Sequence, residues 1–161
     1  MVFWSLPRIS AAAEGLAPFD VRPLGYTFAE AEEFVSALTP DGAEFYLDVQ
    51  HKLDLVYPAL LAATLFFAIA ALLPHRLGAW RWLVALIAIP GSVFDYLEND
   101  AVSTMLDAGD AGLTPGLVET ANRWTVLKSA FSAVAMVIVV ALIVLRALEK
   151  FRRHGARERG E

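Results

Sequence analysis

The chain contains no cysteine, and it has only three histidines in 161 residues. Disulfide bonds and thiol chemistry are therefore excluded, and a zinc site would need histidine and carboxylate ligands alone. The sequence also lacks a phosphate-binding loop, a Ser-His-Asp order, a His-Glu-x-x-His motif and nucleic-acid-binding motifs. Because these patterns mark most cofactor, metal and nucleic-acid sites, we expect no cofactor, no metal and no nucleic-acid partner.

Charge is missing from two long stretches of the chain. Residues 55–73 form a run of 19 without a charged side chain, and residues 129–145 form another of 17. The chain is 57% apolar with a mean hydropathy of +0.52, more than the core of a soluble protein of this size can bury. Runs of about 17 to 25 apolar residues are typical of membrane-spanning helices. The sequence therefore predicts an all-α, polytopic transmembrane helix bundle.

A third apolar stretch is shorter. Residues 82–94 give only 13 uncharged positions, a length that would equally suit a buried soluble helix or an interfacial segment. Extending the same helix over residues 78–99 gives enough rise to cross a bilayer, provided that Asp95 and Glu98 lie near one membrane surface. We therefore expect three full spans, at about residues 53–74, 78–99 and 124–146.

Basic residues are distributed unevenly between the segments that flank these spans. The loop after the first span carries Arg76 and Arg81 without an acid, and residues 147–161 form a basic tail. By contrast, residues 1–52 hold three basic and eight acidic residues, and residues 98–123 hold one basic and five acidic. Because Lys and Arg are retained on the cytoplasmic side, we expect a multi-pass protein of the cell inner membrane with a cytoplasmic carboxyl terminus.

The predicted organisation is a single integral membrane domain over residues 1–161. It comprises an outer-side helical segment at residues 1–52, a membrane bundle at residues 53–146 and the basic cytoplasmic tail at residues 147–161. Thr27 and Glu30 form a capping-box pattern, and Pro40 is placed to begin a further helix, so short outer surface helices are expected. Residues 1–16 are too short to cross a core of about 30 Å, which leaves a partial N-terminal segment.

Four short motifs are spread over most of the chain. They are Asp-x-Arg-Pro-x-Gly-Tyr at residues 20–26, Tyr-Pro at 57–58, Phe-Asp-Tyr-Leu-Glu-Asn at 94–99 and Trp-Thr-x-Leu-Lys at 124–128. Together they resemble a family of small bacterial integral membrane proteins that have four helices and no assigned activity. The resemblance implies a four-helix architecture whose first helix is partial or absent in this chain. It implies no reaction and no ligand.

Polar residues gather at the predicted outer ends of all three spans. On the second span they recur at i, i+3 and i+4, a spacing that places them on one helix face. The predicted cluster consists of Gln50, His51, Asp54, Tyr57, Asp95, Glu98, Asn99, Arg123 and Lys128. A charged group below the membrane interface costs roughly 2.5 to 3.5 kcal/mol unless it is paired or hydrated. We therefore expect Asp95 to contact Lys128 or Arg123 directly.

Three roles are compatible with this cluster. In the first, which we favour, the cluster ties the helices together in a structural or accessory protein that contacts the lipid bilayer and a membrane-protein partner or a second copy of itself. In the second, carboxylates outnumber bases and form a pocket for an ion, a proton or a lipid headgroup. In the third, Asp95 or Glu98 is the general acid or base of a membrane enzyme. Whether the chain is an enzyme stays open.

Overall fold

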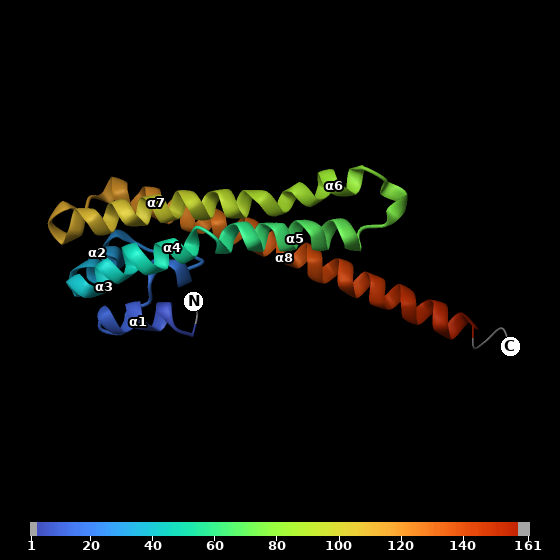
Figure 1. The fold of residues 1–161 in the computed structure, drawn as a ribbon, viewed down its shortest axis with the longest axis horizontal. Helices are drawn as coiled ribbons and strands as arrows, with labels where there is room; N and C mark the ends of the chain where they lie inside the picture. Colours follow the sequence, from blue (N-terminus) through green and yellow to red (C-terminus); the bar gives the residue numbers. More distant parts are fainter. Residues whose placement is uncertain (1–2, 158–161) are drawn as a thin grey trace.

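The computed structural model describes residues 3–157, with side chains to residue 152, and every regular element in that part of the chain is helical. Figure 1 shows an elongated molecule in which short helices at one end continue into long helical arms. We call the compact end, residues 3–52 and 99–124, the headpiece. Residues 53–98 and 125–152 are called the apolar half. The predicted all-α class is confirmed.

The headpiece has an aromatic core of its own. Its short elements are α1 (Ser5–Ala12), η1 (Phe19–Val21), α2 (Phe28–Ala37) and α3 (Pro40–Phe45). Four rings pack one on the next in the order Tyr26, Phe19, Phe34 and Tyr46, with the centroids of neighbouring rings 4.7 to 6.3 Å apart. Val102, Met105, Val118 and Ala121 close this core from the other side of the headpiece. Residues far apart in the sequence are thereby held together at one end of the molecule.

Local signals in the sequence set the starts of α2 and α3 as predicted. The Thr27 amide donates to Glu30 Oε2 at 2.7 Å, and the Glu30 amide donates back to Thr27 Oγ1 at 3.3 Å, which completes the capping box. Pro40 occupies the first turn of α3 behind the Thr39 cap. The partial N-terminal segment forms α1, which is joined to α3 by a Thr39 N–H bond to the Ala12 carbonyl at 3.0 Å.

The first predicted span belongs to a longer, almost continuous helix from Pro40 to Leu72. After α3 it continues through a π-helical turn, η2 (Tyr46–Gln50), and then through α4 (His51–Asp54) and α5 (Tyr57–Leu72). Pro58 lies in the first turn of α5, where its missing amide hydrogen costs no helical hydrogen bond. The helix therefore carries the polar residues of the headpiece directly into the apolar run.

The second predicted span is not one regular helix. It consists of α6 (Trp80–Ala85), the tight turn η4 (Leu86–Ala88) and α7 (Ile89–Gly112), preceded by the loop turn η3 (His75–Leu77). Pro90 has no N–H to donate to the carbonyl four residues earlier, and the regular helix is interrupted at that point. Beyond residue 99, α7 continues into the headpiece, and Gly109, at a φ of +61°, kinks it near its end.

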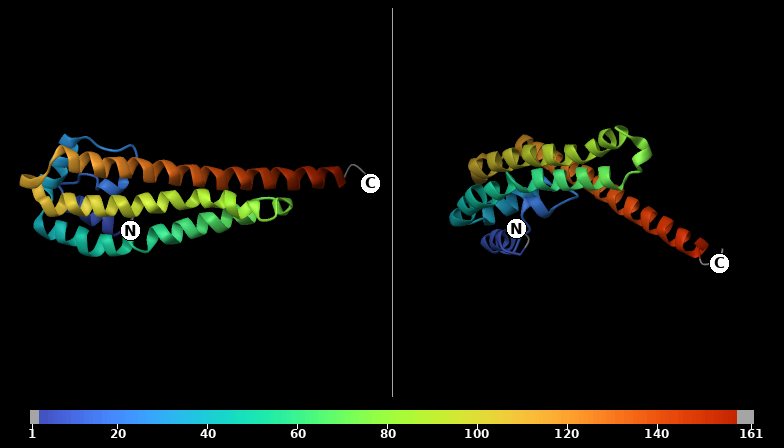
Figure 2. Two further views of the ribbon diagram at one scale, coloured as in Figure 1. Left: turned by 90° about the horizontal axis from the view of Figure 1, so that it is seen from above. Right: turned by 45° about the vertical axis from the view of Figure 1, so that its right-hand side comes forward.

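The third predicted span lies within α8 (Pro115–Arg157), a single long helix. By length and composition, the helices over Pro40–Leu72 and Pro115–Arg152 could cross a membrane, and they are the two that qualify among the described residues. The stretch between them, interrupted at η4 and charged from Asp95 onward, does not qualify by itself. Figures 1 and 2 show this stretch lying beside both α5 and α8.

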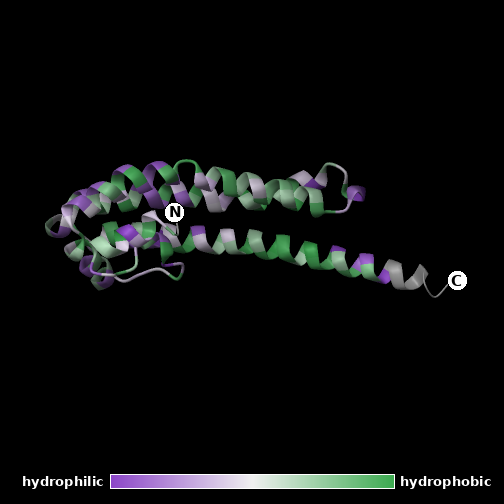
Figure 3. Ribbon diagram, turned by 60° about the horizontal axis from the view of Figure 1, so that its bottom comes forward, coloured by the Kyte–Doolittle hydropathy of each residue, from purple (hydrophilic) through white to green (hydrophobic). Residues whose placement is uncertain are grey.

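The apolar half turns its apolar side chains outward. A small internal core exists, with Leu65, Ile69 and Ala135 among its members, but most large apolar residues of α5, α6 and α8 are exposed. Val137 is 66% exposed and Leu60 is 61% exposed. Figure 3 shows hydrophobic residues along most of the arm formed by α8. Such a distribution is the reverse of that in a soluble protein, and it is the one expected of helices that face lipid.

Candidate functional site

A buried ion-pair network joins α7 to α8 where the headpiece meets the apolar half. Lys128 Nζ forms one ion pair with Glu98 Oε2 and a second, at 3.5 Å, with Asp95 Oδ1. The Lys128, Asp95 and Glu98 side chains are 13%, 14% and 1% exposed. Thr125, one turn before Lys128, donates to Glu98 Oε1 at 2.5 Å. The predicted contact between Asp95 and Lys128 is confirmed, and Glu98 also takes part.

Gln50 and Asp54 face this network from the first long helix. Both side chains are buried, and Gln50 Nε2 donates to Asp54 Oδ2 at 2.9 Å. Within the described part of the chain, Asp54 forms no ion pair. The same helix is tied to α7 by Tyr96, whose hydroxyl donates to the Leu55 carbonyl at 2.7 Å. All three long helices therefore meet at this level.

Asp20 is a member of the site that the cluster predicted from the sequence does not include. It lies in η1, and Tyr46 donates its hydroxyl hydrogen to Asp20 Oδ2 at 2.5 Å. Its neighbour Arg22 does not neutralise it, because Arg22 donates to the Ala17 carbonyl and lies beside the aromatic core. The only signal for Asp20 in the sequence is its place in the first of the four motifs.

These groups line one partly open cavity of about 420 Å³, which we call the outer pocket. Its polar lining consists of Asp20, Gln50, Asp54, Tyr57, Asp95 and Lys128, and its apolar lining consists of Phe3, Leu6 and Val21. Three aspartates therefore face a single lysine, whose charge is already shared between Asp95 and Glu98. With its carboxylates ionised, the pocket carries a net negative charge.

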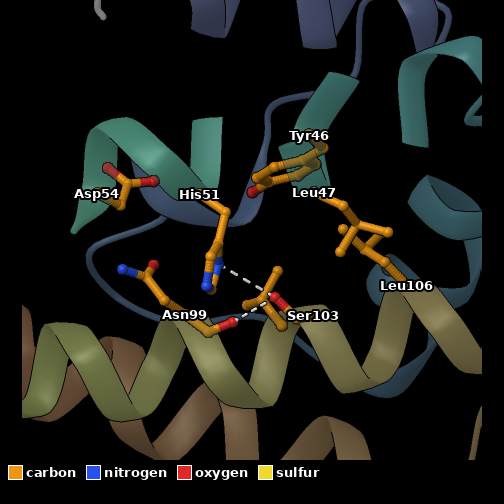
Figure 4. Close-up of a pocket in the computed structure, with 8 residues that line it drawn as sticks. Tyr46, Leu47, His51, Asp54, Asn99, Ser103 and Leu106 are labelled. Carbon is orange, nitrogen blue, oxygen red and sulfur yellow. Dashed lines mark hydrogen bonds between the residues drawn. The ribbon is translucent and has the colours of Figure 1, made fainter. Parts of the chain in front are cut away.

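A second, much smaller cavity lies on the other side of Asp54 (Figure 4). Its volume is about 10 Å³, which is room for about one water molecule. His51 lines it and reaches Ser103 Oγ through Nδ1 at 3.2 Å, while Ser103 donates to the Asn99 carbonyl at 2.8 Å. The predicted cluster is thus not gathered in one cavity: His51 and Asn99 line the small one, Asp54 lines both, and Glu98 and Arg123 line neither.

Arg123, a member of the predicted cluster, takes no part in the contacts described above. Its side chain is exposed, and its guanidinium group lies 5.8 Å from the centre of the Trp124 ring. No ion pair joins Arg123 to the carboxylates within the described residues. Lys128 alone therefore supplies positive charge to the network.

The headpiece is fixed to α8 just beyond the network. The Tyr26 amide donates to Asn122 Oδ1 at 2.9 Å, so the end of the first motif docks one turn from Thr125. Burial raises the pKa of the Tyr26 hydroxyl, which therefore stays neutral at physiological pH. Asn122 and Thr125, like Asp20, are brought to the site by the fold. The cluster predicted from the sequence includes none of the three.

Within the described residues, no group of three or more His, Cys, Asp or Glu side chains is arranged to hold a metal ion. Comparison of the chain with protein-family models, with curated proteins and with solved structures gives no match. The role of the site is therefore inferred from the geometry of its own residues.

Proposed function

We propose that the chain is a three-span protein of the bacterial inner membrane, with the headpiece outside and the carboxyl terminus in the cytoplasm. The exposed apolar surface of α5, α6 and α8 supports membrane insertion. Both α5 and α8 run away from the headpiece, so the chain has to return between them. The stretch of α6, η4 and the first part of α7 makes that return beside both helices, which supports its assignment as the second of the three spans.

The spacing of polar residues along α8 supports the same proposal. The 18 positions from Lys128 to Arg146 give a rise of about 27 Å, close to the thickness of a bilayer core. At the end of the bundle away from the headpiece, Arg146 donates to the Leu72, Ala71 and Leu73 carbonyls at 2.8 to 3.2 Å. It therefore caps the end of α5. Trp124 lies near the end of the spans at the headpiece, and Trp80 and Trp82 lie near the opposite end. This placement matches the aromatic belts of membrane proteins.

We further propose that the outer pocket binds a positively charged ligand. The observation that carries this proposal is the excess of acid in the cavity: among the described residues Asp20 and Asp54 line it without an ion pair, while Lys128 is engaged by Asp95 and Glu98. Burying unpaired carboxylates is unfavourable, and a bound cation would remove that cost. The pocket would then hold its ligand at the outer end of the bundle.

The negative potential of the pocket can be tested without knowing the ligand. Because the chain has no cysteine, Val21→Cys places a single thiol on the pocket lining. We expect a cationic methanethiosulfonate reagent to modify it at least tenfold faster than an anionic one, since a carboxylate-lined cleft concentrates cations. Adding Asp54→Asn should lower this ratio. Adding Asp48→Asn should not, because Asp48 is exposed and paired with Lys52. Equal rates for the two reagents would contradict the proposal.

A structural or accessory role is the second proposed function, and the buried network favours it. Lys128 links Asp95 and Glu98 of α7 to α8, and such polar contacts hold helices together where lipid removes the hydrophobic driving force. In this role the protein would support a membrane-protein partner or a second copy of itself. No observation favours acid–base catalysis by Asp95 or Glu98, because Lys128 engages both carboxylates. Membership in the four-helix family that the motifs resemble also stays a proposal.

A further inference from the structure

The buried side-chain amide of Gln50 gives a second observation on the ligand, in addition to the charge of the acidic residues. Gln50 is completely buried, and its Oε1 atom has no hydrogen-bond partner within the described residues. Its other amide atom, Nε2, is used by Asp54. A buried carbonyl oxygen without a donor is unfavourable, so this oxygen is suited to accept a hydrogen bond from a bound ligand. Gln50 lines the outer pocket, where a ligand can supply that donor.

The hydrogen-bond acceptors near Gln50 Oε1 suit an ammonium group. Gln50 Oε1 is accompanied by the carboxylates of Asp54 and Asp20, which line the same cavity from α4 and η1. A primary ammonium group has three N–H donors and one positive charge. A divalent metal ion would instead need several oxygen ligands at about 2.0 to 2.6 Å, and these side chains are not grouped in that way.

The apolar part of the lining indicates what carries the ammonium group. Phe3, Leu6 and Val21 line the pocket beside the acids, and Phe3 is 99% exposed. Asp54 and Tyr57, which line the pocket, are the last residue of α4 and the first residue of the apolar helix α5. A small hydrophilic cation would leave Phe3 and Val21, which are both exposed, in water. A ligand with a hydrocarbon chain would cover them and extend towards the lipid.

We infer that the outer pocket binds a primary ammonium group carried on a hydrocarbon chain, with Gln50, Asp54 and Asp20 accepting its hydrogen bonds. This inference rests on the proposed cation pocket and specifies its ligand. Free long-chain amines and lipids with an amine headgroup share this chemistry. Phe3, Leu6 and Val21 contact the hydrocarbon part.

Binding can be measured by native mass spectrometry of the full-length protein released from maltoside micelles. The probes are dodecylamine, dodecanol, ethanolamine, phosphatidylethanolamine, phosphatidylglycerol and magnesium ion. We expect dodecylamine to bind at least tenfold more tightly than dodecanol, which lacks the charge, and ethanolamine, which lacks the chain. Asp54→Asn should weaken dodecylamine binding at least tenfold, and Asp20→Asn gives a second test at another segment. Asp48→Asn makes the same chemical change outside the pocket and should bind as the wild type does.

The outcomes separate the two sources of the ligand and the two proposals. If phosphatidylethanolamine is retained and phosphatidylglycerol is not, and Asp54→Asn abolishes the difference, the amine comes from the lipid headgroup. Retention of dodecylamine alone assigns a free amine. If magnesium binding depends on Asp54 and amine binding does not, the cation pocket stands and the ammonium inference is overturned. If Asp54→Asn changes the binding of no probe, both proposals are overturned.

Discussion

At the scale of single residues, Lys128 has the most demanding position in the molecule. One ammonium group serves two carboxylates on the neighbouring helix, and one of them, Glu98, is almost completely buried. Thr125 donates to the Glu98 oxygen that Lys128 does not contact. Both carboxylate oxygens of Glu98 are therefore bound by side chains of α8. Removal of Lys128 leaves a buried negative charge to which, among the described residues, only the Thr125 hydroxyl donates.

Lys128→Met should destabilise the protein by roughly 3 to 5 kcal/mol, the usual cost of removing one partner of a buried ion pair. Adding Glu98→Gln should recover much of that loss, because it removes the uncompensated charge and keeps an acceptor for Thr125. Thermal unfolding in detergent measures both variants. Adding Asp95→Asn instead should recover less, since Asp95 is the more exposed carboxylate and lies farther from Lys128. Equal stability of wild type and Lys128→Met would contradict this account.

Residue spacing predicted part of this site and could not predict the rest. Asp95 and Glu98 share a helix face, and their depth relative to Lys128 follows from helical rise, so their meeting could be predicted. Asp20 reaches the pocket only because the aromatic core folds η1 onto the first long helix. Helical periodicity contains no information on such docking. It also could not show that Asp54 lines two cavities and His51 only one of them, because each cavity is formed between several elements of the fold.

At the scale of elements, α7 and α8 are held at close range by small residues. A Cβ atom added at Gly91 would lie 2.6 Å from Ser132 Oγ and 3.2 Å from the Ser132 amide nitrogen. Backbone on the facing helix cannot move aside as a flexible side chain can. The absence of a side chain at Gly91 therefore sets the distance between the two helices, three residues before Phe94 stacks on Trp124.

Gly91→Val should destabilise the protein by roughly 1 to 3 kcal/mol, because the added methyl groups force α7 away from α8. Gly116→Val is the matched control. Gly116 lies in the first turn of α8, and a Cβ atom there meets nothing within 4 Å, so its stability should change by less than about 0.5 kcal/mol. Thermal unfolding in the same detergent compares the two. An equal loss at both positions would indicate a general cost of valine rather than a packing limit.

The helices also show which features a hydropathy pattern does not predict. The runs at residues 55–73 and 129–145 became regular helices because nothing in them removes a backbone donor after the first turn. The shorter run contains Pro90, and the helix is interrupted at η4 just before it. Beyond Glu98, α7 is polar and packs in the headpiece, so its hydropathy does not mark where a membrane would end. The helix over residues 78–99 was predicted, and the structure interrupts it at η4.

At the scale of the whole molecule, the headpiece and the apolar half have opposite surfaces. The headpiece buries an aromatic core and exposes charge, whereas the apolar half exposes large aliphatic side chains along α5, α6 and α8. The ion-pair network and the outer pocket lie at the boundary between them. A bilayer around the apolar half would place this boundary at its outer surface, where carboxylates can meet both water and amphiphilic ligands.

The orientation of the chain in the membrane is the most direct test of this account. Single cysteines can be placed by the same substitution at two exposed positions: Ala111→Cys near the end of α7 and Ala79→Cys before α6. The wild-type chain has no thiol, so each reading is unambiguous. We expect a membrane-impermeant maleimide to label Ala111→Cys in intact cells and to label Ala79→Cys only after the inner membrane is opened. Labelling of Ala79→Cys in intact cells, or recovery of the protein in the soluble fraction, would contradict the account.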